Sequence, residues 1–359
     1  MGAQKSIHAG KAKIDFNVDL SHKLCEAISF SQGSYGNLYS QIIGSLSVKH
    51  PNLFGRNEKL DILWDKGLDD SNILIAFRRP RPEWYSQQSF VFQHSISPEI
   101  SVYGEPTDGF NCSVSRGINL CRFSLGLDLD EPSTSNWLST TSIKFEHIRP
   151  INNEGRSIIR DSDGFPITSS GNQNDNMVVL KQESEYAVVN DDSFSRLNFQ
   201  MEQGLPLLPK WLVFNRFKFT ASKGIKLGPT FLTTSLTGGS IVGDMAPHQA
   251  FTIGGFGSVR GYGDGAAGSG RSCLVANSEL TVPLMNELQG AIFMDCGTDL
   301  NSSRLVPGNP ALRLGKPGFG VGFGYGIRLN SRLGQVWVDY AINAFQKKKI
   351  YFGVNNVGS

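Results

Sequence analysis

Apolar and polar residues alternate with a period of two along nearly the whole chain, and this pattern limits the folds open to it. Residues 11–20 show it most clearly, because every even-numbered residue there is apolar and every odd-numbered residue is polar. The same alternation returns in residues 59–65 and 335–343. Such a strand has one apolar face and one polar face. Since no segment has the period of a convincing amphipathic helix, the sequence predicts an all-β protein.

About sixteen segments have strand character, and many are long enough to cross a bilayer as tilted strands. They are residues 11–22, 37–49, 56–67, 71–79, 88–97, 113–127, 137–149, 178–190, 194–204, 212–222, 228–237, 271–284, 288–298, 317–329, 334–344 and 348–355.

The connections between these segments differ in length. The long ones, residues 150–177, 238–270 and 299–316, follow odd-numbered strands, whereas the others are mostly short. A closed up-and-down barrel has this asymmetry when both termini lie on the side of the tight turns. We therefore expect a single transmembrane antiparallel β-barrel over residues 11–355, with a short N-terminal arm over residues 1–10. The Asn-rich connection 150–177 is expected to be a mobile, solvated loop.

Soluble β-sandwiches and propellers also alternate, so they are the competing fold class. Their cores are apolar, whereas here the polar face of many strands is crowded with charged residues. A closed soluble core could not pair so many charges. The balance favours the membrane barrel, and membrane lipids are then its first expected partner.

The composition argues against several other classes of protein. The formal net charge is +2, which gives no reason to expect a nucleic-acid partner. The 5 Cys and 6 His residues are scattered without metal-ligand spacing, so neither a metal site nor a disulfide framework is expected. No nucleophile elbow or zinc-binding helix is present, and we expect neither an enzyme nor a cofactor.

The long connection 238–270 carries one arginine between glycines, in the run Val259-Arg260-Gly261-Tyr262. Long loops inside a compact protein are usually functional. An arginine there could be a static plug anchor or part of a mobile element. In either case it needs acidic partners if the loop folds into the barrel.

A predicted hairpin supplies two such acids. If its turn centres on Glu287, then Glu279 and Asp295 lie directly opposite each other, because 279 + 295 equals twice 287. Facing carboxylates are unfavourable without a cation between them. The sequence therefore predicts that Arg260 enters the barrel and lies between these two acids.

A row of glycines offers the loop a place to lie. Gly318, Gly320, Gly322, Gly324 and Gly326 alternate with bulky apolar residues. Glycines along one strand face are costly unless something packs against the bare backbone. We expect the apolar residues to face lipid and the glycines to form a slot that the folded-in loop occupies.

These motifs resemble the BamA/FhaC-type outer-membrane barrel superfamily, also called the bacterial surface antigen family. Its V-R-G-Y loop tip reads Val259-Arg260-Gly261-Tyr262 here, and its F-x-D-x-G motif reads Phe293-Met294-Asp295-Cys296-Gly297. The acid of its preceding strand matches Glu279. The resemblance implies that the loop tip folds inward and that Arg260 bonds to both acids. It also implies insertion of barrel proteins or translocation of polypeptides.

The N-terminus departs from the family's usual plan. Only residues 1–10 precede the first expected strand, which leaves no room for a POTRA domain. The chain is therefore similar to the POTRA-less plastid outer-envelope members, whose mass its 39.3 kDa matches. The start has no secretory h-region, and Gly2 fits the pattern for N-myristoylation. We expect the plastid outer membrane, with the mitochondrial outer membrane as the alternative.

Three functions stay open from the sequence. The first is insertion or translocation of proteins, with unfolded β-barrel or preprotein clients and other outer-envelope translocon components as partners. The second is a passive pore for ions or small solutes, with the loop as its constriction. The third is a non-conducting accessory subunit of an assembly complex.

Overall fold

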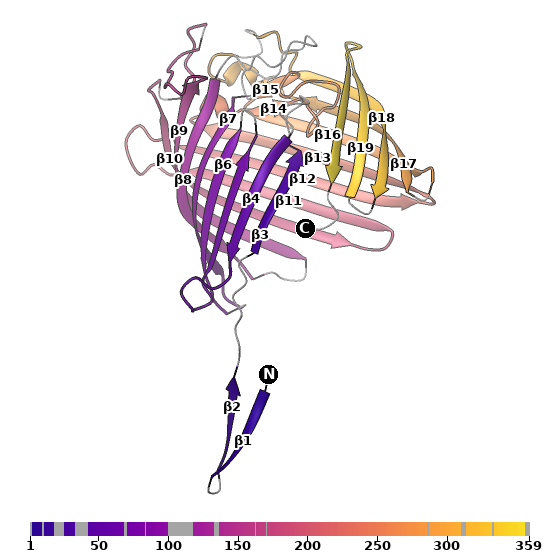
Figure 1. Ribbon diagram of the computed structural model, residues 1–359. Coiled ribbons are helices and arrows are strands. Elements are labelled where there is room, and N and C mark those ends of the chain that lie inside the picture. The colour runs from indigo at the N-terminus through magenta and orange to yellow at the C-terminus, as the bar shows by residue number, and fades with distance from the viewer. Residues whose placement is uncertain are drawn as a thin grey trace.

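The fold is described from a computed structural model. It describes residues 2–8, 11–17, 25–32, 42–67, 70–82, 84–99, 118–132, 136–161, 163–169, 171–285, 287–309, 314–331 and 334–355. Sixteen strands form one antiparallel sheet in which neighbours along the chain pair with each other (Figure 1). Between its first and last strands, the sheet skips only β14 (Phe251–Ile253) and β15 (Gly268–Gly270), which pair with each other inside the long loop. The all-β prediction is confirmed.

The strands of the main sheet are β3 (Cys25–Gln32), β4 (Ile42–His50), β5 (Lys59–Lys66), β6 (Ser71–Arg79), β7 (Gln87–Pro98), β8 (Ile118–Asp130), β9 (Trp137–Asn152), β10 (Asp175–Val189), β11 (Ser193–Gly204), β12 (Phe214–Leu227), β13 (Thr230–Gly243), β16 (Ser272–Pro283), β17 (Leu288–Thr298), β18 (Phe319–Ser331), β19 (Gly334–Asn343) and β20 (Lys348–Asn355).

The two edges of the sheet come together, which makes it a barrel. Cα atoms of β20 and β3 lie within 8 Å of each other. No hydrogen-bonded register joins these two strands among the described residues, in contrast to every other neighbouring pair. The barrel is therefore closed at this seam by proximity rather than by a ladder. In the part of the chain that the structure describes, no helix is long and apolar enough to cross a membrane.

The first barrel strand differs from the prediction. Residues 11–17 form β2, which pairs with β1 (Gly2–His8) in a separate hairpin that Figure 1 draws apart from the barrel. The barrel instead begins at β3, so the expected barrel strand 11–22 is wrong. The alternation in residues 11–17 does mark a strand. However, alternation cannot tell a local hairpin partner from a barrel neighbour.

The barrel wall has a lipid-facing side and a lumenal side. Large side chains such as Ile292, Phe323 and Tyr325 are 62%, 51% and 61% exposed on the outward face. The apolar core lies inside, where the long loop meets the wall. There Ile253 and Val259 of the loop are fully buried.

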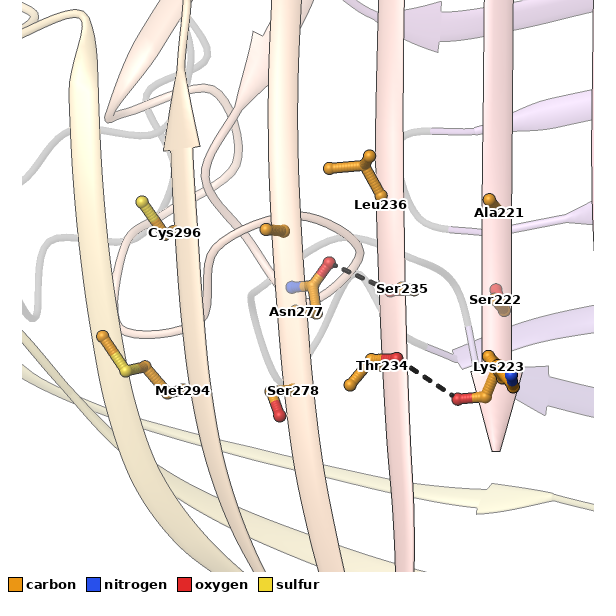
Figure 2. Close-up of a pocket in the computed structure, with 11 residues that line it drawn as sticks. Ala221, Ser222, Lys223, Thr234, Ser235, Leu236, Asn277, Ser278, Met294 and Cys296 are labelled. Carbon is orange, nitrogen blue, oxygen red and sulfur yellow. Dashed lines mark hydrogen bonds between the residues drawn. The ribbon is translucent and has the colours of Figure 1, made fainter. Parts of the chain in front are cut away.

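A groove of about 560 Å³ crosses the outward face of β12, β13, β16 and β17 (Figure 2). Its floor contains two small side chains, Ala221 and Ala276, which pair across the sheet with Leu236 on either side of it. The next outward row contains Thr234 and Ser278, which also pair with each other. The groove is therefore a direct result of strand register.

The connection between β9 and β10 is more ordered than expected. It carries isolated β-bridges between Ile151 and Ser157 and between Arg160 and Pro166. Ile167 is only 2% exposed there. The expectation of a wholly solvated loop is therefore wrong for this residue, because it is buried.

Candidate functional site

The in-folded loop begins later than predicted. β13 extends to Gly243, so residues 238–243 belong to the wall, and the loop runs over residues 244–271. Glycines within β13 explain the difference, because they leave space for aromatic rings. A β-carbon at Gly238 would lie 2.5 Å from the Phe219 ring, and one at Gly239 would lie 2.5 Å from the Phe251 ring. The loop contains a short 3-10 turn, η1 (Pro247–Gln249), and the strands β14 (Phe251–Ile253) and β15 (Gly268–Gly270).

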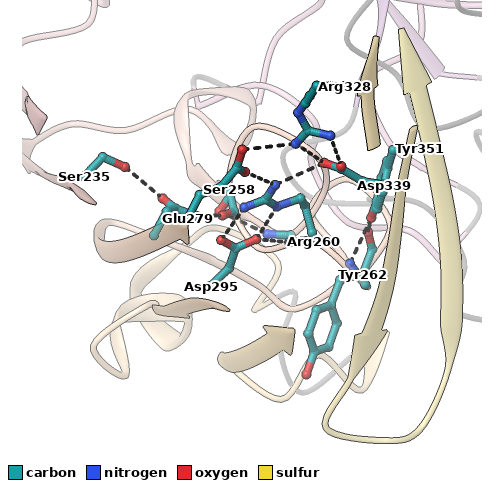
Figure 3. Close-up of polar contacts among 12 residues, drawn as sticks. Ser235, Ser258, Arg260, Tyr262, Glu279, Asp295, Arg328, Asp339 and Tyr351 are labelled. Carbon is teal, nitrogen blue, oxygen red and sulfur yellow. Dashed lines mark hydrogen bonds and ion pairs between the residues drawn. The ribbon is translucent and has the colours of Figure 1, made fainter. Parts of the chain in front are cut away.

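Arg260 at the loop tip donates three hydrogen bonds to the carboxylate of Asp295 on β17 (Figure 3). Its Nε lies 2.7 Å from Oδ2, its Nη2 lies 3.0 Å from Oδ1, and its backbone N–H donates to Oδ2 at 3.1 Å. Asp295 is fully buried and Arg260 is 7% exposed. A forked, buried contact of this kind fixes orientation as well as charge.

Two further acids complete the shell around Arg260. Its Nη1 donates to Glu279 Oε2 at 2.8 Å and to Asp339 Oδ2 at 3.1 Å. Arg328 contacts the same two acids, with Nη2 lying 3.1 Å from Glu279 Oε1 and Nη1 hydrogen-bonded to Asp339 Oδ1. Two cations therefore share three carboxylates, since Asp295 is the third, and the formal charge of the cluster is −1. We call these five residues the lumenal clamp.

The predicted register of the hairpin is wrong by two residues. Glu279 pairs with Phe293, and Asp295 pairs with Asn277, so the two acids are diagonal neighbours on one face. The turn is centred one residue earlier than expected, and a backbone bond from Leu284 N to Leu288 O closes it. A shift of two keeps every side chain on its predicted face, whereas a shift of one would have reversed them.

The aromatic residue of the same motif lies under the arginine. The guanidinium carbon of Arg260 is 3.5 Å from the centre of the Phe293 ring. A desolvated cation over an aromatic face is attracted to the ring. Phe293 is 2% exposed, so it also separates the clamp from water on that side.

The rest of the loop tip is held by backbone contacts. Val259 packs against Gly297, where an added β-carbon would lie 2.8 Å from its Cγ2. Gly261 has φ of 95° and lies against Asn343, whose side chain donates to the Gly261 carbonyl at 3.0 Å. The Tyr262 hydroxyl accepts a bond of 3.4 Å from the Val321 backbone.

The last strand of the barrel also holds the tip. The Tyr351 hydroxyl of β20 donates to the Tyr262 carbonyl at 2.7 Å and accepts from the Gly261 N–H at 3.1 Å (Figure 3). Tyr351 is 2% exposed. The loop tip therefore contacts β16, β17, β19 and β20 directly, as well as the glycine row of β18.

Only part of the glycine row meets the loop. A β-carbon at Gly322 would lie 1.8 Å from the Arg260 carbonyl oxygen, and one at Gly320 would lie 2.9 Å from Ala267. Gly318 donates its N–H to the Ala267 carbonyl at 2.8 Å. In contrast, the nearest atoms to Gly324 and Gly326 come from the wall, from Tyr340 and Asp339 respectively among others. The slot for the loop thus ends at Gly322.

Sequence reasoning missed four residues that hold or complete this site. Asp339 and Asn343 lie on the polar face of a strand whose alternation is plain in the sequence. Arg328 continues the even-numbered row of glycines, and Tyr351 lies opposite the apolar face of β20. Their faces were therefore readable. Their convergence on Arg260 was not, because it depends on how far the loop reaches into the lumen.

Comparison with known proteins identifies the family. Residues 52–356 match the Omp85 superfamily domain. The chain belongs to the Omp85 superfamily. This membership confirms the resemblance seen in the loop-tip and strand motifs.

Relatives and solved structures of this superfamily cover the whole barrel. Outer envelope protein 39 of the Arabidopsis thaliana chloroplast is 66% identical over 360 residues, covering 100% of this chain and 99% of that relative. Outer envelope protein 80 of the same organism is 40% identical, covering 90% of this chain and 44% of that relative. BamA from Haemophilus ducreyi lacking POTRA domains 1-3 has the same fold, with a TM-score of 0.68 at 17% identity, covering 98% of this chain and 74% of that structure. This Omp85 chain is an outer-envelope protein of the plastid, which decides against the mitochondrial alternative.

Proposed function

We propose that this Omp85 barrel takes part in the insertion or translocation of proteins at the plastid outer membrane. The observation that carries the proposal is the anchoring of the loop tip to three strands of the wall. Arg260 bonds to Asp295 of β17 and Asp339 of β19, and the Tyr262 carbonyl bonds to Tyr351 of β20. This anchoring holds the strands from β16 to β20 together as one unit. The unit ends at the seam with β3, where no ladder of hydrogen bonds joins the described strands.

The edge of β20 is the element that would meet a client. An unpaired strand edge presents N–H and C=O groups on which another strand can add. β20 contains Gly353 in its interior, and glycine lowers the cost of distorting a strand. An unfolded barrel segment would pair with this edge while the clamp keeps the rest of the C-terminal wall in place. Other outer-envelope translocon components would deliver such clients.

A passive pore is the second candidate, and one observation favours it. The loop does not fill the lumen, because a cavity of about 330 Å³ remains between it and the wall. Arg216 and Lys218 of β12 line the wall side of this cavity, and Gly257 and Ser258 line the loop side. Arg216 is paired with Glu202, and Asp264 also lines the cavity, so its charges are mixed and small ions of either sign could enter.

One reconstitution separates the two functions. The protein is placed in lipid vesicles, and both the folding rate of an unfolded barrel client and the ionic conductance are measured. We expect faster folding of the client than in protein-free vesicles. Conductance without any acceleration would contradict protein insertion and support the pore.

A further inference from the structure

We propose that the groove on the outward face of β12, β13, β16 and β17 binds a glycerolipid with an anionic headgroup, and that Lys223 holds this headgroup. The groove is separate from the lumenal clamp, because its exposed side chains point toward lipid. Leu236 and Met294 line it and are 40% and 58% exposed. Figure 2 shows the lining residues on the four adjacent strands, with Lys223 near the end of one of them.

Rows of large side chains border the groove above and below. On one side of the groove lies the outward cross-strand row with Phe219 and Leu274, which both pair with Gly238. On the other side lies the outward row that runs through Ile225, Leu232, Leu280 and Ile292. Between them the small side chains Ala221, Thr234, Ala276 and Ser278 leave the volume of about 560 Å³. This is within the range of about 300–1,000 Å³ that bound small molecules occupy.

Lys223 is out of place on this surface unless it has an anionic partner. Among the described residues of β10–β19, it is the only charged residue whose register position faces outward. It forms no ion pair with any residue that the structure describes. Arg216 and Lys226 of the same strand face the lumen side and are paired with Glu202 and Asp192. A lysine on the lipid side of a barrel costs free energy unless its ammonium reaches the headgroup level or an anion.

The position of Lys223 fits a headgroup at one end of the groove. It lies four residues before Leu227, the last residue of β12, a distance of about 13 Å along the strand. A long lysine side chain can carry its charge from that depth toward the interface. The hydroxyls of Thr234 and Ser278 follow Lys223 in the same outward row. The Thr234 hydroxyl donates to the Lys223 carbonyl at 3.4 Å, so the Ser278 hydroxyl is the donor for the ester region of a lipid. The apolar remainder of the groove suits an acyl chain.

Charge complementarity decides between the occupants of the groove. A second copy of this chain would bring the same lysine, because a symmetric interface presents one patch to itself. A neutral lipid would fill the groove and leave the ammonium without a counter-charge. An anionic lipid satisfies both the shape and the charge, and anionic headgroups attract lysines near a membrane surface.

The test uses native mass spectrometry of the full chain, extracted from vesicles that contain equal amounts of phosphatidylglycerol and phosphatidylcholine. We expect the unsubstituted protein to retain phosphatidylglycerol in about fivefold preference, because one lysine near an anionic surface contributes about 1 kcal/mol. Lys223→Gln should abolish the preference, and Lys223→Arg should keep it. Ala276→Leu should displace both lipids, since it fills the groove floor.

A matched control separates the groove from general surface charge. Lys348 also faces outward, on β20, because it pairs with outward-facing Ile342. Lys348→Gln removes the same charge elsewhere and should leave the preference intact. Equal retention of both lipids by the unsubstituted protein would overturn the proposal, as would equal effects of the two lysine substitutions. A lipid-free dimer as the main species would also overturn it, by making a second copy the occupant.

Discussion

At the scale of single residues, Arg260 is the side chain whose removal we expect to destabilise the protein most. It is one of two cations among three carboxylates, and Asp295 and Asp339 are both fully buried. Its removal would leave buried acids with Arg328 as their remaining cation in the clamp. The sequence identified Arg260, Glu279 and Asp295 by face and motif. It could not supply Asp339 and Arg328, since their role depends on the depth of the loop.

Arg260→Ala is therefore expected to lower the free energy of unfolding by about 3–5 kcal/mol, the usual cost of breaking a buried ion pair. The measurement is urea unfolding from lipid vesicles. Arg196→Ala is the matched control, because Arg196 pairs with Glu185 while its side chain is 64% exposed. The control should cost about 0–1 kcal/mol. Equal costs for the two variants would show that the clamp is not a buried network.

Gly322→Ala tests the fit of the loop against the wall. A β-carbon there would lie 1.8 Å from the Arg260 carbonyl, so the loop tip must move away. We expect limited proteolysis of the loop to become faster. Gly257→Ala is the control in the same loop, because no atom lies within 4 Å of its added β-carbon. If both variants resist protease like the unsubstituted protein, the loop tip does not lie against Gly322.

His248 gives the loop a predictable response to acid. It is 7% exposed in η1, and burial, with help from the charges of Arg122 and Arg216, lowers its pKa from 6.5 to about 3. The Asp175 carboxylate lies 4.0 Å from its Nδ1. Between these two pH values the unfolded chain binds a proton at this residue and the folded protein does not. Stability from this group is therefore complete above pH 6.5 and is lost as the pH falls toward 3.

The check is to compare the unsubstituted protein with His248→Asn by unfolding at several pH values. The stability difference between them should shrink on acidification with a slope approaching about 1.4 kcal/mol per pH unit. This slope is expected only at pH values between the pKa of the unfolded chain and that of the folded protein. A difference that stays constant with pH would mean that His248 is protonated as easily in the folded protein as in the unfolded chain.

At the scale of elements, alternation predicted the wall well and its edges poorly. Fifteen of the sixteen expected segments overlap strands of the main sheet, whereas the first, 11–22, instead overlaps β2 of the N-terminal hairpin. β3 was missed because it is only 8 residues long, CEAISFSQ, and carries few large apolar side chains. The loop boundary was also misplaced, because the glycines that suggested a loop at residues 238–239 are instead spaces for aromatic rings.

The link between loop and last strand gives a prediction at this scale. Tyr351→Phe removes the hydroxyl that bonds the Gly261 N–H and the Tyr262 carbonyl. A buried backbone group left without a partner costs about 1–3 kcal/mol. Amide hydrogen exchange should therefore accelerate at the loop tip and in β20. Tyr325→Phe, at a residue 61% exposed on the outward face, should leave both regions unchanged. Equal exchange rates in the two variants would show that the Tyr351 hydroxyl does not couple the loop tip to β20.

At the scale of the whole molecule, the barrel combines a C-terminal unit that the loop fixes, β16 to β20, with a free strand edge. The clamp and Tyr351 join the loop tip to strands near the C-terminus. The seam between β20 and β3 lies beside this fixed unit. The number of strands and the motifs of the superfamily were readable from the sequence. The contact of the loop with β20 was not, because it brings together residues separated by 89 positions.

The most direct test of this account is the rate at which an unfolded barrel client folds into vesicles carrying the protein. The account predicts acceleration by the unsubstituted protein and by Gly257→Ala. It predicts a loss of acceleration in Tyr351→Phe, which loosens the loop tip from β20 while leaving Arg260 paired. A client folding rate equal to that of protein-free vesicles, with the unsubstituted barrel correctly folded, would contradict it.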